Sequence, residues 1–216
     1  MKYLIFGLVA LYFSTVNAAL ITPSDVSGVG VFYNNGSTTG VDLNRLSDGV
    51  IPAEGTDWRN VKNIYWQNTT PGQVALPFLM LNLGSLYNID DILVSVDNND
   101  DYFVDWSVNS STWNRLFSID YRYGEIGFGM DTMSTDSTHT EYVSGIDFST
   151  IQAQYLRISA SSSDTGGFAN DNNYSTGEFQ AFGSRVSSGG TVPEPTTLVL
   201  IGIGFAGMGY RRKRAM

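Results

Sequence analysis

Three apolar runs of strand length follow one another in the middle of the chain, and they constrain the fold more than any other feature. They cover residues 74–83, 89–96 and 102–108, and each has the length of a typical β-strand. The third run alternates, with Tyr102, Val104, Trp106 and Val108 set against Phe103, Asp105 and Ser107. Alternating side chains of a strand point to opposite faces, so we expect the first set to face a core and the second mostly solvent.

The segments between and after these runs favour an all-β domain. The connectors 84–85 and 97–101 are rich in the residues that turns prefer. Two further strands are expected at 155–160 and 174–182, with a polar loop at 161–173 between them. Glycine recurs throughout, and no comparable segment of the domain shows helical periodicity, so a β-sandwich is predicted. The sequence contains no cysteine, so the sandwich must be stable without disulfides.

Both ends of the chain have the pattern of targeting segments. Lys2 precedes an apolar run at 3–13 and the small-residue pattern Val16-Asn17-Ala18, which predicts a signal peptide over residues 1–18, cut by signal peptidase. A retained signal anchor is the alternative. The Ser/Gly-rich stretch 185–191 is expected to be a flexible linker.

The last 25 residues run in a fixed order. An uncharged apolar segment at 196–210 is preceded by Val192, Pro193, Glu194 and Pro195 and followed by Arg211, Arg212, Lys213 and Arg214. Such a segment should enter a bilayer with its basic end in the cytoplasm. As a helix it would reach about 22 Å, which is short for a hydrocarbon core of about 30 Å and favours a transient anchor.

This tail resembles the PEP-CTERM sorting signal of Gram-negative bacteria. The resemblance implies recognition by an exosortase, removal of the tail near the Pro-Glu-Pro motif, and delivery to the cell surface or extracellular matrix. An ordinary C-terminal membrane anchor with a proline hinge is the alternative.

The charge of the domain argues against nucleic acid as a partner. The two terminal segments hold five of the 12 basic residues and one of the 21 acidic residues, so residues 19–192 carry a formal charge of −13. Phosphate binding draws on clustered Lys and Arg. An acidic surface keeps an exported protein soluble and can attract cations.

Catalytic motifs are absent from the sequence. His139 is the only histidine, no cysteine is present, and no G-x-S-x-G pattern occurs, so neither a serine triad nor a zinc set can be assembled. Carboxylate pairs can hydrolyse glycosides, but no motif singles out two of the many acidic residues. We therefore predict a non-enzymatic binding module, with a glycoside-active enzyme as a less favoured alternative.

Four landmarks in one order resemble discoidin-type (galactose-binding-like) domains across residues 24–184. They are Leu46-Ser47-Asp48-Gly49 with Thr56-Asp57-Trp58, the segment 78–84, Tyr155-Leu156-Arg157-Ile158, and the segment 178–183. The resemblance implies a jelly-roll β-sandwich over 19–184 that binds sugars, lipids or proteins through loops at one end. The gap between Gly49 and Thr56 is longer than usual for the family.

The same resemblance implies a structural calcium ion. Carbohydrate-binding relatives hold it with oxygens that match Asp48, Thr56 and Glu178, and calcium prefers six to eight oxygen ligands. Local hydrogen bonds and surface ion pairs of these residues are the alternative. The acidic segment 97–101 does not fit an EF-hand, because the sixth position is Tyr102 and the twelfth is Val108; a solvated hairpin turn is expected there.

Aromatic and polar residues near expected loops are candidates for carbohydrate binding, since sugar rings stack on aromatic faces. The predicted ligand-binding residues are Arg59, Tyr65, Trp66 and His139, with Trp66 favoured. Trp58 and Trp106 are expected to pack in the core. A polysaccharide is the expected ligand, and a structural or adhesive role in which the domain binds another matrix protein is the alternative.

Overall fold

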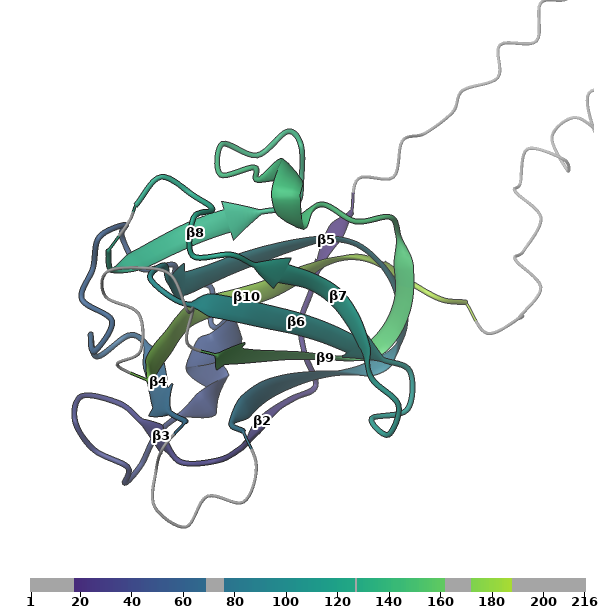
Figure 1. Cartoon of the computed structure of the whole chain (residues 1–216). Helices are drawn as coiled ribbons and strands as arrows, with labels where there is room; N and C mark the ends of the chain where they lie inside the picture. Colours follow the sequence, from purple (N-terminus) through teal and green to yellow (C-terminus); the bar gives the residue numbers. More distant parts are fainter. Residues whose placement is uncertain (1–17, 69–75, 127, 162–171, 188–216) are drawn as a thin grey trace, which may run out of the picture. The chain divides into compact units, whose positions relative to one another are not determined.

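The structure, a computed structural model, describes residues 18–68, 76–126, 128–161 and 172–187. Its strands are β1 (Ala19–Ile21), β2 (Asp25–Val29), β3 (Phe32–Tyr33), β4 (Ile64–Gln67), β5 (Phe78–Asp97), β6 (Asp101–Ser107), β7 (Asn114–Ile119), β8 (Met130–Ser134), β9 (Ile151–Ser161) and β10 (Asn173–Arg185). Two short 3-10 helices, η1 (Leu43–Ser47) and η2 (Ser144–Ile146), complete the described elements. The predicted all-β sandwich is confirmed (Figure 1).

The strands form two layers that share β5. The first part of β5, Phe78–Asn82, pairs with β2 on one side and β9 on the other, and β9 continues to β6 and β7. The second part, Tyr87–Asp97, pairs with β10 and β8, and β10 continues to β4 and β1. At the start of this part, Tyr87–Ile89 also pair with β9. In Figure 1, β6, β7 and β9 lie in front of β10. A strand that passes from one sheet to the other normally does so at a bend or bulge.

That bend lies at Gly84, where the sequence predicted a turn between two strands. The register against β9 shifts between Asn82 and Tyr87, and Gly84 has a φ of +76°, a conformation that favours glycine. The Asn82 side chain accepts a hydrogen bond of 2.9 Å from the Gly84 N–H. The predicted turn is therefore wrong: backbone pairing continues past this point, and the two predicted strands are one.

The alternation predicted for β6 holds only in its first half. Tyr102 and Val104 are fully buried, but the register against β7 shifts between Val104 and Asp105, and the alternation changes phase there. Asp105 is buried rather than solvated, because Arg115 and Arg157 both bond its carboxylate. Trp106 is half-buried and packs against the core, as predicted. Val108, beyond the strand, is 48% exposed, so its prediction as a core residue is wrong.

The turn at 97–101 does join β5 to β6, but it is buried instead of solvated. Asp97, Asn98 and Asp100 are each 2% exposed or less. The segment before β8 covers them: Asn98 donates to the carbonyls of Ile126 and Gly129 at 2.9 and 3.1 Å. The polar residues of the turn therefore bond to the segment before β8, which packs over them, instead of to solvent.

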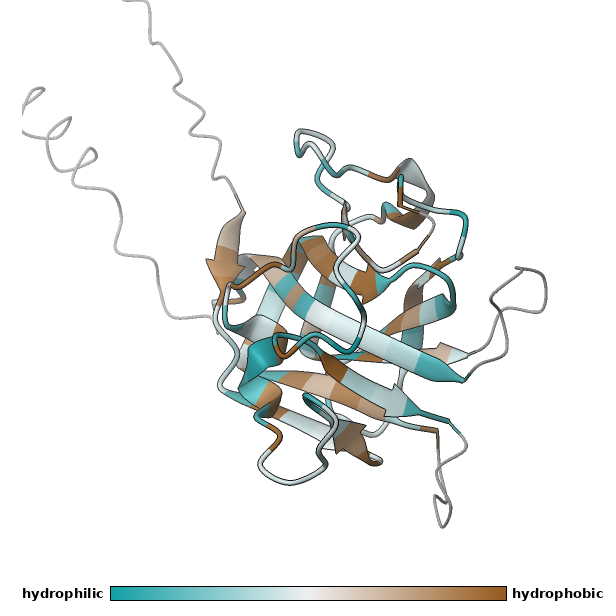
Figure 2. Cartoon of the chain, turned by 90° about the vertical axis from the view of Figure 1, so that its left-hand side faces the viewer, coloured by the Kyte–Doolittle hydropathy of each residue, from teal (hydrophilic) through white to brown (hydrophobic). Residues whose placement is uncertain are grey.

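The core lies between the layers and is rich in aromatic rings. Trp66 is fully buried and contacts Phe32, Tyr102 and Tyr174 with ring centroids 6.0–6.3 Å apart. Figure 2 shows hydrophobic residues concentrated on the strands, with hydrophilic residues mostly in the loops. This packing anchors β4, whose neighbouring residue Tyr65 belongs to the candidate site.

The terminal segments lie almost entirely outside the described residues. The predicted signal peptide (1–18, except Ala18), most of the linker (185–191) and the whole tail (192–216) fall there. The compact unit that holds the sandwich ends at Val186. Within the described ranges, no helix could span a bilayer.

Candidate functional site

Four side chains form an aromatic cluster beside β3 and β4, which we call the aromatic platform: Tyr33, Trp58, Arg59 and Tyr65. Tyr65 stacks on Tyr33 at 5.3 Å and receives the edge of Trp58 at 5.1 Å, at an interplanar angle of 90°. The Arg59 guanidinium lies 5.2 Å from the centre of the Trp58 ring. Trp58 and Tyr33 are half-buried, Arg59 is exposed, and Tyr65 is buried with 7% of its surface exposed. The surface open to a ligand therefore comes from Trp58, Tyr33 and Arg59, and Tyr65 supports their rings.

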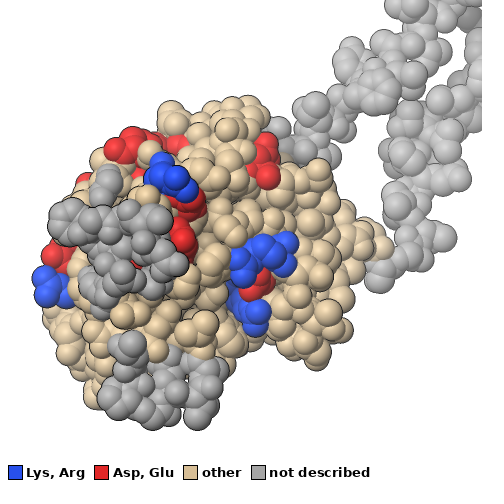
Figure 3. Space-filling model, viewed as in Figure 1, with Lys and Arg blue, Asp and Glu red and all other residues tan. Residues whose placement is uncertain are grey.

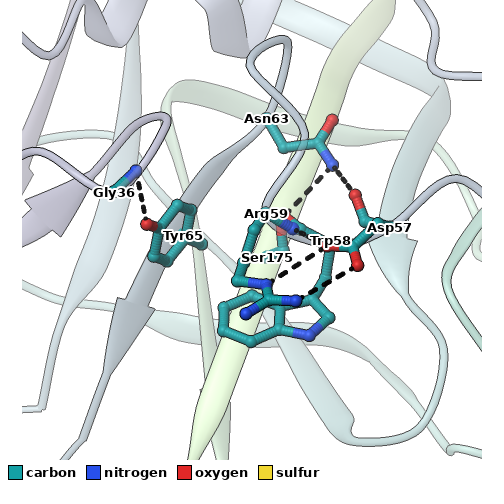
Figure 4. Close-up of polar contacts among 7 residues, drawn as sticks. All are labelled: Gly36, Asp57, Trp58, Arg59, Asn63, Tyr65 and Ser175. Carbon is teal, nitrogen blue, oxygen red and sulfur yellow. Dashed lines mark hydrogen bonds and ion pairs between the residues drawn. The ribbon is translucent and has the colours of Figure 1, made fainter.

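Hydrogen bonds fix the backbone that carries this platform (Figure 4). The Trp58 carbonyl accepts from Ser175 Oγ at 2.8 Å and from Asn63 Nδ2 at 3.2 Å. Tyr65 Oη accepts from the Gly36 N–H at 2.8 Å. Three segments distant in sequence, η1 to β4, the loop after β3, and β10, thus hold the platform before any ligand arrives, which reduces the entropy lost on binding.

Arg59 is held in place by Asp57. The Asp57 carboxylate accepts from the Arg59 backbone N–H at 2.8 Å and pairs with its guanidinium at 3.4 Å. These hydrogen bonds from Arg59 lower the pKa of Asp57. Because both side chains are more than half exposed, the pair orients the guanidinium rather than stabilising the fold.

The structure brings together two of the four predicted ligand-binding residues, Arg59 and Tyr65. Trp66 is fully buried, because the side chains of Tyr65 and Trp66 point to opposite faces of β4; its prediction as a ligand contact is wrong. The tryptophan of the platform is instead Trp58, which was expected in the core and is half-buried at the surface. Recognising 64–67 as a strand would have assigned both residues correctly.

His139 lies apart from the platform in the described contacts, in the loop after β8. It lines an open cavity of about 660 Å³ with Asp90, Asp91 and Asp136 among its walls. Burial, followed by the charge of Asp136, raises the pKa of Asp91. His139 Nδ1 accepts a hydrogen bond from the Glu141 N–H at 3.1 Å, so this nitrogen has a structural partner.

Two of the three predicted calcium ligands lie together. The Gly49 N–H and Gln180 Nε2 donate to Glu178 Oε1 at 3.2 and 3.0 Å. Asp48 Oδ1 caps the same turn by accepting from Val50 N–H at 2.8 Å. Glu178 is fully buried, and its Oε2 has no hydrogen-bond partner in the described part of the chain.

Burial raises the pKa of Glu178 to about 7, and the nearby charge of Asp48 adds to the effect. A buried carboxylate oxygen without a partner is costly unless a cation meets it. The donor set around Glu178 and Asp48 therefore fits a calcium ion, with the backbone carbonyls of residues 45–50 close by in sequence.

Thr56, the third predicted ligand, has its contacts elsewhere. Its hydroxyl donates to the Ala53 carbonyl, and its own carbonyl accepts from the Met130 N–H at 2.9 Å. The long gap between Gly49 and Thr56 places Thr56 on a loop that packs against the start of β8. The threonine therefore joins a different set of loops from Asp48.

Four arginines of the described residues form ion pairs with three aspartates. Arg115 and Arg157 both bond Asp105, and Arg122 bonds Asp120 at 2.6 Å. Figure 3 shows basic side chains lying beside acidic ones on the face drawn. No unbroken basic surface is seen on that face.

Comparison with known proteins identifies the tail. A family model described as the PEP-CTERM protein-sorting motif matches residues 191–214. The chain carries a PEP-CTERM sorting motif. The resemblance seen in the tail sequence is thereby confirmed, over the segment from Val192 to Arg214. Among curated proteins, no match was found.

Several solved structures are similar to the chain at low sequence identity. A CBM32 of AlyQ in complex with 4,5-unsaturated mannuronic acid has 10% identity and a TM-score of 0.46, over 76% of this chain and 97% of that one. CBM32-1 from a family 31 glycoside hydrolase of Clostridium perfringens has 12% identity and a TM-score of 0.43, over 75% and 96%. Chitosan-binding module 1 from a chitosanase/glucanase of Paenibacillus sp. IK-5 has 16% identity and a TM-score of 0.43, over 76% of this chain and 97% of that one.

One similar structure is much longer than the matched region. The chain covers 37% of a truncated AlyQ with CBM32 and alginate lyase domains, at 11% identity and a TM-score of 0.47.

Proposed function

We propose that the sandwich is a non-enzymatic, exported carbohydrate-binding module whose ligand contacts the aromatic platform. The observation that carries the proposal is the pairing of an accessible Trp58 ring with an oriented Arg59 guanidinium. The apolar face of a sugar packs on an aromatic ring, while the guanidinium donates several hydrogen bonds to hydroxyl or carboxylate oxygens.

The charge of Arg59 favours a saccharide that carries carboxylate groups. Arg is suited to planar, two-pronged binding of carboxylates, and Asp57 already fixes its direction. An anionic polysaccharide outside the cell would supply this group repeatedly along its length. The strongly acidic domain would repel such a polymer elsewhere, which would restrict binding to this position.

Calcium is proposed at the turn formed by Asp48 and Gly49 against Glu178. The unpartnered, buried Oε2 of Glu178 supports this assignment, and Asp48 and carbonyl groups of the turn would complete the oxygen set. Calcium would supply structural charge compensation there, linking the loop after η1 to β10. Because β10 also holds the Trp58 backbone through Ser175, a firm turn would help to fix the platform.

The tail supports a proposal for location. Signal peptidase would remove residues 1–18, the segment 196–210 would hold the protein transiently in the inner membrane, and an exosortase would then process the PEP-CTERM motif. The sandwich would be released to the cell surface or the extracellular polysaccharide matrix. Arg211–Arg214 would face the cytoplasm only before processing.

A glycan array tests the proposed ligand. Full-length protein in mild detergent should bind uronic-acid-containing saccharides, and Trp58→Ala should lose at least tenfold in affinity. Trp113→Ala, which removes a half-buried tryptophan elsewhere on the surface, is the matched control and should retain binding. Absence of binding to every saccharide, with retention on cells reversed only by proteolysis, would favour the structural matrix protein instead.

A further inference from the structure

Three glutamates from separate loops meet at one place outside the sites described so far. They are Glu54, before β4; Glu125, between β7 and β8; and Glu141, after β8. A carboxylate oxygen from each lies within 4.8 Å of those of the other two. Glu54 and Glu125 are exposed and Glu141 is half-buried.

Backbone hydrogen bonds hold these three loops together. The Gly55 N–H donates to the Met130 carbonyl at 2.9 Å, and the Met130 N–H returns a bond of 2.9 Å to the Thr56 carbonyl. The Glu141 carbonyl accepts from the Ser134 N–H at 2.7 Å, at the other end of β8. The meeting of the carboxylates is therefore set by the fold rather than by three independent surface side chains.

The negative charges of this cluster are not offset by a neighbouring arginine. Burial and the nearby carboxylates raise the pKa values of both Glu54 and Glu125. The arginines closest in sequence, Arg59 and Arg122, form ion pairs with Asp57 and Asp120, and no ion pair within the described residues involves the three glutamates. Like charges placed this close destabilise the fold unless a cation joins them.

A fourth carboxylate, that of Asp131, is buried near the cluster, and its charge helps to raise the pKa values of Glu54 and Glu125. Asp131 has no exposed surface, and its Oδ2 accepts from the Ile126 N–H at 3.1 Å and from Asn98 Nδ2 at 3.0 Å. A Cβ placed on Gly124 would lie 2.1 Å from the same oxygen, so the carboxylate is directed into the Gly124–Ile126 segment that carries Glu125. Its Oδ1 has no hydrogen-bond partner within the described residues.

We propose that Glu54, Glu125 and Glu141 bind a calcium ion, with the negative charge of Asp131 nearby. Calcium takes oxygen ligands at 2.3–2.6 Å, so two ligands on opposite sides of one ion lie roughly 5 Å apart; the separations here fit within that limit. The three glutamates supply hard oxygen donors, which suit calcium better than zinc. Because the cluster is partly exposed, we expect affinity in the range of about 0.1–1 mM, typical of extracellular modules.

This site would be independent of the one at Asp48 and Glu178, with which it shares no residue. The ion would join the loop of Glu54 to the two loops that flank β8. Trp58 lies four residues after Glu54 in the same loop, so calcium would also restrict the segment that leads into the aromatic platform.

Calorimetric titration of full-length protein with calcium chloride tests the proposal. In mild detergent and after removal of bound metal, Glu54→Gln/Glu141→Gln should bind one calcium ion fewer per chain than the unaltered protein. Glu178→Gln should keep the ion that this double variant loses. Asp25→Asn, an exposed acidic residue of β2, controls for the loss of negative charge and should change nothing.

The melting temperature of the double variant shows whether its loss of calcium binding comes from misfolding. Without calcium, the double variant should melt at or above the temperature of the unaltered protein, because repulsion between the carboxylates is relieved. If it does not fold, the single exposed change Glu125→Gln should weaken binding at least tenfold. The proposal would be overturned if these variants bound calcium with unchanged stoichiometry and affinity. It would also be overturned if Glu178→Gln bound no calcium at all.

Discussion

Replacing Glu178 with glutamine should stabilise the calcium-free protein and remove its response to calcium at this position. Glutamine keeps an acceptor for the Gly49 N–H and Gln180 Nε2, which both bond Oε1. It removes the charge on Oε2, the oxygen that has no hydrogen-bond partner in the described part of the chain. The substitution therefore changes the free energy of unfolding mainly through the buried charge, because the hydrogen bonds that shape the turn are kept.

The size of the effect follows from the pKa of Glu178, which burial raises from 4.5 to about 7. That difference corresponds to about 3 kcal/mol, and we expect about 2 kcal/mol because solvent around the exposed Asp48 turn screens part of it. The native state holds the proton more tightly than the unfolded chain, so stability falls as pH rises from about 4.5 to about 7. At pH 8 the glutamine variant should be more stable by about 2 kcal/mol, and at pH 5 by less than about 1 kcal/mol.

Urea unfolding, followed by tryptophan fluorescence at pH 5 and pH 8 in EDTA, measures both differences. Repeating it in 10 mM calcium should raise the stability of the unaltered protein more than that of Glu178→Gln. Asp25→Asn serves as the control for a lost surface charge. A glutamine variant that is less stable than the unaltered protein in EDTA at pH 8, or that responds equally to calcium, would refute this account of Glu178.

Three further predictions concern packing and binding. Trp66→Ala should lower the free energy of unfolding by about 3–5 kcal/mol in urea titrations, whereas Trp58→Ala should change it by less than about 1 kcal/mol; equal losses would contradict the assignment of these two tryptophans. Gly183→Ala should cost more than about 1 kcal/mol, since the new Cβ would lie 1.9 Å from the Asn88 carbonyl oxygen; an unchanged free energy of unfolding would contradict the steric explanation. Asp105→Asn should cost about 3 kcal/mol, because it leaves Arg115 and Arg157 without their shared carboxylate; an unchanged melting temperature would show that this pair of ion bridges contributes little.

The sequence predicted the longer strands and missed the short ones. The segments 155–160 and 174–182 became parts of β9 and β10; in β9, Leu156, Ile158 and Ala160 are buried at alternate positions, as expected for a strand buried on one face. β8, Met130–Ser134, has a polar composition yet is buried along its whole length, where Asp131 accepts hydrogen bonds from Asn98 and from the Ile126 N–H. Such burial depends on residues distant in sequence, so local sequence patterns do not predict it.

The candidate site was predicted in part for a related reason. Arg59 and Tyr65 were predicted as ligand contacts because a charged and an aromatic residue stand near an expected loop, and the structure brings them together on the platform. Trp58 and Trp66 were exchanged because a tryptophan flanked by polar residues can face either way, and the short strand β4 was not recognised. The glutamate cluster could not be predicted at all, because Glu54, Glu125 and Glu141 are brought together only by backbone contacts between three loops.

The long strand β5 has a consequence for how the domain comes apart. The two halves of β5 belong to different sheets. If one sheet opens, β5 loses hydrogen-bond partners along half of its length, and the other sheet is then left with a less stable strand. Neither sheet can serve as a stable unfolding intermediate, so amide protons of β2 and β8, which pair with opposite halves of β5, should exchange with solvent through the same global opening. An exported protein without disulfides would gain from this cooperativity, because a protease would find few partly open forms to cut.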